Sequence, residues 1–203
     1  MHKIAILIIP PRNLNNIVLY YKKIVKKKFN NQKYLSHPVH LTLFAGYVEN
    51  YSSVQNHFLL KKIKNKFKKT FDISIEKKEI FFNDIFTGGN TMVFSVKKNN
   101  NLLKIQKNIL FELKPYLVNN ILNIKNLKNI SMRKNYEQFG FPFVGKNWIP
   151  HFTVASINKR HKTDLFFKNF LKNKIDNKNY KIIKISFFKV YKNKHNHFFD
   201  IKF

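Results

Sequence analysis

The spacing of apolar residues predicts strands and helices along most of the chain. A short apolar run between turn signals is typical of a buried strand, and apolar residues three and four positions apart indicate an amphipathic helix. In the first third these patterns predict a strand at 4–9, a helix at 14–29, a strand at 39–48, a helix at 52–67 and a strand at 71–75. Ser52 or Ser53 is the expected N-cap of the second helix, because a hydroxyl oxygen accepts a hydrogen bond from the free amides of a first turn.

Two glycines mark a hairpin in the middle of the chain. The segment 87–90 reads Thr-Gly-Gly-Asn and lies between apolar runs at 80–86 and 92–96, and glycine takes the positive φ of a tight turn without strain. A further amphipathic helix is predicted at 102–113, ending near Pro115. Residues 118–147 show no regular pattern, so we expect a connecting loop there.

The last fifty or so residues repeat the order of elements predicted between residues 39 and 96. The expected elements are a short strand from 149, a helix at 163–175, a strand at 182–191, a turn at 192–196 and a last strand ending at 203. We therefore expect two β-α-β-β units, at 39–96 and 149–203. No linker of flexible composition separates them, which predicts one α+β domain over residues 1–203, with two lobes facing each other across a cleft.

A His-x-Thr triplet occurs in each predicted unit, as His40-Leu41-Thr42 and as His151-Phe152-Thr153. Residues i and i+2 of a strand point to the same face, so each triplet presents an imidazole and a hydroxyl together while its central apolar residue faces the core. Random placement of the His and Thr residues predicts roughly 0.24 such triplets in a chain of this length. The sequence contains three.

The third triplet, His161-Lys162-Thr163, has a structural interpretation. Lysine stands where the pattern needs an apolar residue, and Thr163 is the expected N-cap of the helix that follows. A single His on an apolar strand is usually part of the core. The other two triplets form a matched pair, each closely following a proline and preceding a helix, and this favours a catalytic role for both.

Composition limits the chemistry and the location that can be expected. With 203 residues, 44% of them hydrophobic, the chain can bury a sizeable core. It contains no cysteine, which excludes disulfides, thiolate zinc ligands and a cysteine nucleophile, and a cytoplasmic protein is the default. The N-terminal apolar run is too short to span a bilayer and reaches Pro10 and Pro11 before any cleavage-site pattern, so we expect no membrane anchor.

The net charge of +29 has two interpretations. A field of this size attracts polyanions such as RNA or nucleotides. An AT-rich coding sequence, which favours Lys and Asn, explains the same charge without any function. The charge therefore supports a nucleic-acid-like substrate but does not establish one.

The segments 38–43 and 148–154, Pro-Val-His-Leu-Thr-Leu and Trp-Ile-Pro-His-Phe-Thr-Val, resemble the paired motifs of the 2H phosphoesterases, also called the LigT-like or RNA 2',3'-cyclic phosphodiesterase group. The order of predicted elements extends the resemblance over most of the chain. It implies a bilobal, pseudo-twofold α+β fold, with two facing antiparallel sheets, outer helices, and one motif from each lobe in a central cleft. One departure is Val39, which separates Pro38 from His40 by one residue more than is common in this group.

The resemblance also implies an activity. His40 and His151 would act as general acid and general base, and Thr42 and Thr153 would donate hydrogen bonds to the phosphate, with no metal or other cofactor. The group acts on 2',3'-cyclic phosphates, 2',5'-oligoadenylates, oligouridine ends of RNA or cyclic dinucleotides. We expect a monomer that cleaves a 2',5'-linked nucleotide, either linear 2',5'-oligoadenylate or cyclic 2',3'-cGAMP, as a viral immune-evasion enzyme in the host cytoplasm. The alternative is an RNA 2',3'-cyclic phosphodiesterase in RNA end processing.

Two other classes of function compete with this interpretation. A metal site could use His37 and His40, but odd spacing on a strand places them on opposite faces, and a chain with no Cys and ten acidic residues offers few further ligands. A non-catalytic RNA-binding module could use aromatic residues of the predicted loop. Tyr136, Phe139 and Phe141 are candidates for stacking on a base, and plain packing within the loop is the competing interpretation.

Overall fold

Eight strands form one antiparallel sheet in the computed structural model, which describes residues 1–203 except 68, 119–126, 128, 173–177 and 193. The strands are β1 (His2–Ile8), β2 (Leu41–Val48), β3 (Phe71–Phe81), β4 (Asn90–Val96), β5 (His151–Ile157), β6 (Asn179–Ile182), β7 (Lys184–Tyr191) and β8 (Lys194–Lys202). Their order in the sheet is β6-β3-β4-β5-β2-β1-β7-β8. The α+β fold class is thus confirmed, and the two expected sheets are joined edge to edge where β2 meets β5.

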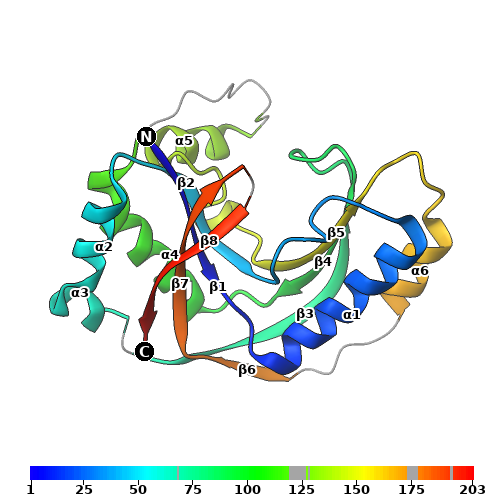
Figure 1. The fold of residues 1–203 in the computed structure, drawn as a ribbon, viewed down its shortest axis with the longest axis horizontal. Helices are drawn as coiled ribbons and strands as arrows, with labels where there is room; N and C mark the ends of the chain where they lie inside the picture. Colours follow the sequence, from blue (N-terminus) through cyan, green and yellow to red (C-terminus); the bar gives the residue numbers. More distant parts are fainter. Residues whose placement is uncertain (68, 119–126, 128, 173–177, 193) are drawn as a thin grey trace.

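The helices cover the sheet in two groups, one for each lobe (Figure 1). They are α1 (Arg12–Phe29), α2 (Tyr51–Leu59), α3 (Lys61–Asn65), α4 (Asn100–Leu113), α5 (Ile130–Phe139) and α6 (Asp164–Lys172), with short 3-10 turns η1 (Lys114–Tyr116) and η3 (Gly145–Asn147). Helix α1 contacts β5 and α6 contacts β3, whereas α4 contacts β2 and α2 contacts β8. Within the described parts of the chain, no helix combines the length and the apolarity needed to cross a bilayer.

The two predicted repeat units interleave in the sheet. Strand β5, from the second unit, pairs with β4 of the first, while β2 of the first unit pairs with β1, which in turn pairs with β7 of the second. Each half of the sheet therefore contains strands of both units. This exchange places β2 and β5, the strands with the two triplets, side by side at the centre of the sheet.

The expectation of a loop over residues 118–147 is wrong for its second half, where α5 and η3 lie. Helix α5 is mostly polar, and Tyr136 is its one buried residue, so its apolar pattern is too weak to predict it. Its ends are well defined instead: the Asn129 side chain accepts hydrogen bonds from the first-turn amides, and Gly140 ends the helix with φ +63°. Residues 119–126 and 128 of the expected loop lie outside the described residues.

Several other predicted boundaries differ from the structure. The helix expected at 52–67 breaks at Leu60 into α2 and α3, and its N-cap is Asn50 rather than either serine. The strands expected at 71–75 and 80–86 are one strand, β3, which ends at Phe81. The strand expected at 182–191 divides at Ile183, because β6 pairs with β3 at one edge while β7 pairs with β1. Residues 173–175 of the helix expected at 163–175 lie outside the described residues.

Candidate active site

The pairing of β2 with β5 aligns the two His-x-Thr triplets. Leu41 lies opposite Phe152 in the antiparallel register, and both side chains are fully buried. Continuing this register by one residue in each direction places Thr42 beside His151 and Thr153 beside His40. Because side chains alternate along a strand, these four polar groups share the face opposite to the two buried apolar residues.

All four of these residues line one cavity of about 450 Å³. The size is in the range of small-molecule sites, which are commonly about 300 to 1,000 Å³. Much of the wall is apolar and comes from β3, the β3–β4 loop and the segment before β5: Phe81, Phe82, Ile85, Phe86, Phe141, Phe143, Trp148 and Ile149. The Trp148 indole N–H donates to the carbonyl oxygen of Thr42 at 3.1 Å, which fixes this segment against β2.

Both imidazoles are held in the same way by the backbone that precedes them. Nδ1 of His40 lies 2.7 Å from the carbonyl oxygen of Pro38, and Nδ1 of His151 lies 2.7 Å from that of Ile149. A carbonyl oxygen only accepts, so Nδ1 carries the hydrogen in both rings. Nε2 is therefore the nitrogen that can take or give a proton, and both rings are oriented for that purpose.

His40 lies in a cluster with two further imidazoles and the ammonium ion of Lys22. Its ring centroid lies 5.3 Å from that of His195 on β8, and the His195 ring lies 5.4 Å from that of His37. Burial lowers the pKa of His40 to about 4; the Pro38 carbonyl opposes this shift, and His195, His37 and Lys22 add to it. His40 is therefore neutral over the whole physiological range.

Lys22 contributes to this cluster from a buried position on α1. Its Nζ donates to the carbonyl oxygens of Tyr34 at 2.5 Å and His37 at 3.0 Å, so the ammonium ion ties α1 to the segment that leads into β2. Burial lowers the pKa of Lys22 to about 8 and that of His195 to about 4. The Nδ1 atom of His195 is buried without a hydrogen-bond partner among the described residues.

Carboxylates lie near the second imidazole. Burial lowers the pKa of His151, while the Ile149 carbonyl and the carboxylates of Asp84 and Glu79 oppose the shift. The Asp84 carboxylate is held in place, because it accepts hydrogen bonds from the Thr91 hydroxyl at 2.7 Å and the Phe86 amide at 2.8 Å. The two imidazoles of the cavity thus lie in fields of opposite sign.

The aromatic residues proposed for base stacking occupy different places. Phe141 lines the cavity, where its ring packs edge-on against Phe44 and Phe143. Tyr136 is buried on α5, and Phe139 is half-buried against the core; neither belongs to the described lining of the cavity. Helix α5 rather than a loop carries these two side chains, and it turns them inward.

His37 and His40 line the same cavity, so the sequence argument that placed them on opposite faces is wrong. That argument assumed a strand from residue 39, whereas β2 begins at Leu41 and the preceding residues are irregular. Among the described residues, no three His, Asp or Glu side chains gather in a way that could hold a metal ion. His161 of the third triplet lies elsewhere, 3.3 Å from the Gln32 side chain and edge-on to Phe29.

The sequence pattern does not indicate His195, Lys22 or Asp84 as residues of the site. His195 reaches the neighbourhood of the cavity because β8 pairs with β7, which pairs with β1. Lys22 reaches the cavity because α1 packs against β5. Asp84 reaches it from the loop between β3 and β4. The one local signal is the position of His195 within the predicted turn at 192–196. The strand predicted at 80–86 includes Asp84, whereas β3 ends at Phe81 and Asp84 lies in the loop that follows.

Several solved structures have the same fold over nearly the whole chain. TT0787 of Thermus thermophilus aligns with a TM-score of 0.64 at 12% identity, covering 98% of this chain and 97% of that one. A structure described as a phosphoesterase aligns with a TM-score of 0.57 at 8% identity, covering 98% and 96%. Escherichia coli LigT in its apo form gives 0.54 at 7% identity, covering 98% and 95%. No family model and no curated protein sequence matches the chain.

Proposed function

We propose that this chain, which has the LigT-like fold of the 2H phosphoesterases, is a phosphodiesterase that cleaves ribonucleotide phosphate esters by acid–base catalysis without a metal. The observation that carries the proposal is the register of β2 with β5, in which Leu41 pairs with Phe152. It sets one imidazole and one hydroxyl from each triplet on the same cavity wall. An arrangement of this kind can hold one phosphate between two proton-transfer groups.

In the proposed reaction, one imidazole removes a proton from the nucleophile and the other gives a proton to the leaving oxygen. For a 2',5' linkage the nucleophile is the neighbouring 3'-hydroxyl, which attacks phosphorus while the 5'-oxygen departs, and the product is a 2',3'-cyclic phosphate. For a substrate that is already cyclic, water takes the place of the ribose hydroxyl. Thr42 and Thr153 donate hydrogen bonds to the non-bridging oxygens, on which negative charge grows in the transition state.

The fields around the imidazoles favour His40 as the base and His151 as the acid. A general base must be neutral before the reaction, and burial, with smaller contributions from His195, His37 and Lys22, keeps the pKa of His40 near 4. The acid must carry a proton. Burial lowers the pKa of His151, and the carboxylates of Asp84 and Glu79 oppose this shift, so their charges favour its imidazolium form. A bound phosphate adds further negative charge beside both rings, which favours protonation of the one that already faces carboxylates.

The proposal also extends to the identity of the substrate and to the biological role. We propose a 2',5'-linked nucleotide, linear 2',5'-oligoadenylate or cyclic 2',3'-cGAMP, with viral immune evasion in the host cytoplasm as the biological role of a monomeric enzyme. The alternative is RNA that ends in a 2',3'-cyclic phosphate. Support for a nucleotide comes from the aromatic wall, where the exposed rings of Phe82 and Phe86 offer faces to a base. Escherichia coli LigT, of the same fold, has been crystallised with 3'-AMP and with ATP.

A substrate panel tests this function. The protein is incubated, with EDTA present, with 2',5'- and 3',5'-linked oligoadenylate, 2',3'-cGAMP and 2',3'-cyclic mononucleotides, and products are separated by chromatography. Cleavage of 2',5' linkages alone supports the finer proposal, and hydrolysis of the cyclic mononucleotides alone supports the alternative. Selective hydrolysis of 3',5' linkages contradicts both. A non-catalytic binding module would bind the nucleotides and release no product from any of them.

A further inference from the structure

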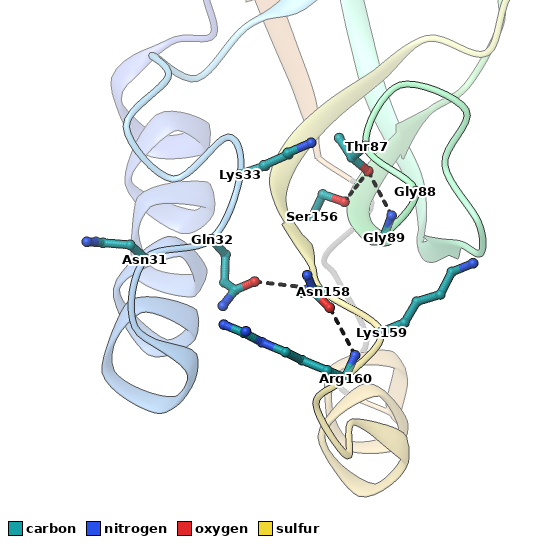
Figure 2. Close-up of a pocket in the computed structure, with 10 residues that line it drawn as sticks. All are labelled: Asn31, Gln32, Lys33, Thr87, Gly88, Gly89, Ser156, Asn158, Lys159 and Arg160. Carbon is teal, nitrogen blue, oxygen red and sulfur yellow. Dashed lines mark hydrogen bonds between the residues drawn. The ribbon is translucent and has the colours of Figure 1, made fainter.

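A second pocket, of about 280 Å³, lies where three segments meet (Figure 2). The segments are the loop after α1, the tip of the β3–β4 loop, and the end of β5 with the turn that leads to α6. The lining residues are Asn31, Gln32, Lys33, Thr87, Gly88, Gly89, Ser156, Asn158, Lys159 and Arg160. They are all polar or glycine, in contrast to the aromatic wall of the catalytic cavity.

The described lining of the pocket carries positive charge and no negative charge. Lys33, Lys159 and Arg160 line it, and none of its described lining residues is acidic. In the part of the chain that the structure describes, none of these three side chains forms an ion pair or a hydrogen bond with another residue. Their charges are therefore available to an anion.

The neutral groups of the pocket fix its shape. Gln32 Oε1 accepts a hydrogen bond from the backbone N–H of Asn158 at 3.0 Å. Asn158 Oδ1 accepts one from the backbone N–H of Arg160, also at 3.0 Å (Figure 2). The Ser156 amide donates to the Lys33 carbonyl oxygen at 3.0 Å. These bonds tie the loop after α1 to the end of β5, so the backbone that carries all three cations is held in place before any ligand arrives.

Two hydroxyls at the back of the pocket leave one donor free. Thr87 Oγ1 and Ser156 Oγ lie 2.6 Å apart, and Thr87 Oγ1 also accepts a hydrogen bond from the Gly89 amide at 3.1 Å (Figure 2). One of the two O–H groups is used in the bond between them, whichever way it points, so the other can donate to a ligand. An oxygen-rich anion would accept from it.

The second pocket adjoins the catalytic cavity along two elements. Within the β3–β4 loop, Asp84 and Phe86 line the catalytic cavity, while Thr87 and the glycines that follow line the second pocket. Along β5, Ser156 lies five residues beyond His151, which corresponds to about 17 Å at ~3.3 Å per residue. A stacked single strand rises about 3.4 Å per phosphate, so about five nucleotides span this distance, and fewer when the strand is extended.

We propose that this second pocket binds a backbone phosphate of a linear oligonucleotide substrate, a few nucleotides away from the phosphate that is cleaved. This inference rests on the proposed function and narrows it to substrates longer than a dinucleotide. A phosphate fits the pocket better than a base does, because no aromatic residue lines it among those described and its free groups are cations and a hydroxyl donor. Such contacts depend on charge and not on base identity.

The test compares substrates of increasing length that share one scissile linkage. The triple variant Lys33→Ala, Lys159→Ala, Arg160→Ala is expected to lose about tenfold or more in kcat/KM on an eight-nucleotide substrate, through KM, because all three cations that line the phosphate site are removed. Its kcat/KM on a dinucleotide or a cyclic mononucleotide should stay within about twofold of the parent. The slope of log K against log salt concentration for binding of the long substrate should fall by about 0.7, the value for loss of one phosphate contact on a single strand.

A matched control variant distinguishes phosphate binding in this pocket from the general attraction of an anion to a basic protein. Lys104→Ala, Lys107→Ala, Lys114→Ala removes the same charge from exposed positions on α4 and η1 that line neither described cavity. It should leave the dependence on substrate length unchanged. Equal losses in the two triple variants, or no loss on the long substrate in the pocket variant, overturn the inference.

A protein that lacks phosphodiesterase activity would give a different set of results. If the parent protein turns over no nucleotide at all, the phosphodiesterase proposal fails, and the pocket is then judged by binding alone. Fluorescence anisotropy with a labelled eight-nucleotide strand, on protein that carries His40→Ala and His151→Ala, measures this directly. Binding weakened about tenfold by the pocket substitutions, and not by the control ones, supports the phosphate site. Equal binding in both variants rejects it.

Discussion

Leu41 of β2 lies opposite Phe152 of β5, and both side chains are completely buried in the core. This pair joins the two halves of the sheet. The same pair sets the register of the residues on either side, so a slip of one residue would turn one imidazole and one hydroxyl into the core. The chemistry of the cavity therefore depends on packing at a pair of residues that never faces it.

Replacing the threonine hydroxyls should slow the chemical step more than it weakens binding. Thr42→Val and Thr153→Val keep the β-branched shape and remove the hydrogen-bond donor. If these hydroxyls stabilise growing charge on phosphate, each change lowers kcat by about 10²- to 10³-fold. Steady-state kinetics measures this, and a rise in KM with unchanged kcat would show that the hydroxyls contribute ground-state binding only.

His195→Gln should move the acidic limb of the pH profile to higher pH. His195 lowers the pKa of His40, which with burial lies near 4. With the neighbour removed, the pKa of His40 rises toward its ordinary value, and the base is lost to protonation at a higher pH. The measurement is kcat/KM against pH for both proteins. An acidic limb that does not move contradicts the assignment of His40 as the base.

Asp84→Asn should move the basic limb of the same profile to lower pH. The Asp84 carboxylate raises the pKa of His151, so without this charge the imidazolium gives up its proton more easily. Activity that needs protonated His151 is then lost at a lower pH than in the parent. Thermal unfolding serves as the control, because Asp84 also accepts a hydrogen bond from the buried Thr91 hydroxyl. A shift of the acidic limb instead would mean that His151 is the base and His40 is the acid.

The free energy of unfolding should fall as the pH drops from about 6.5 to about 4. His40 and His195 both have pKa values near 4 in the folded protein, below the ordinary value of about 6.5 that they regain on unfolding. In this window the unfolded chain binds more protons, so stability rises with pH. Urea unfolding at several pH values measures the slope. His195→Gln should flatten it, and an unchanged slope would show that His195 titrates normally in the folded state.

Gly89→Ala should destabilise the protein and disturb the second pocket. A Cβ at this position would lie 2.6 Å from the Ile157 carbonyl oxygen and 2.8 Å from Ser156 Oγ. Overpacking of this kind typically costs about 1 to 3 kcal/mol. The matched substitution is Gly88→Ala, which meets no atom within 4 Å but has a φ of +69°. A smaller loss for Gly89→Ala than for Gly88→Ala would mean that the loop tip does not press against β5.

The sequence was sufficient to place the two triplets at the starts of two strands and to expect their convergence. The signal is local: a His and a Thr two residues apart with an apolar residue between them, next to or within a strand that is mostly buried. Alternation then determines the face. Most strands and the longer amphipathic helices, such as α1 and α4, follow from the same kind of pattern because their apolar residues are numerous.

The features that could not be predicted depend on contacts distant in sequence. The histidine cluster around His40 requires β8 to lie near the start of β2, and nothing local to His195 encodes that pairing. Helix α5 has one buried residue and is defined by its caps, so periodicity could not find it. The second pocket joins segments more than a hundred residues apart, tied together by Gln32 and Asn158.

The most direct test of the account is turnover by His40→Ala, His151→Ala and His161→Ala, measured with EDTA present on the nucleotide that the parent cleaves best. The account predicts that each of the first two variants loses about 10²- to 10⁴-fold in kcat, as expected for loss of one proton-transfer group, and that His161→Ala keeps parental activity. Folding is checked by circular dichroism. Turnover that survives in a folded His40→Ala or His151→Ala variant would contradict the central claim.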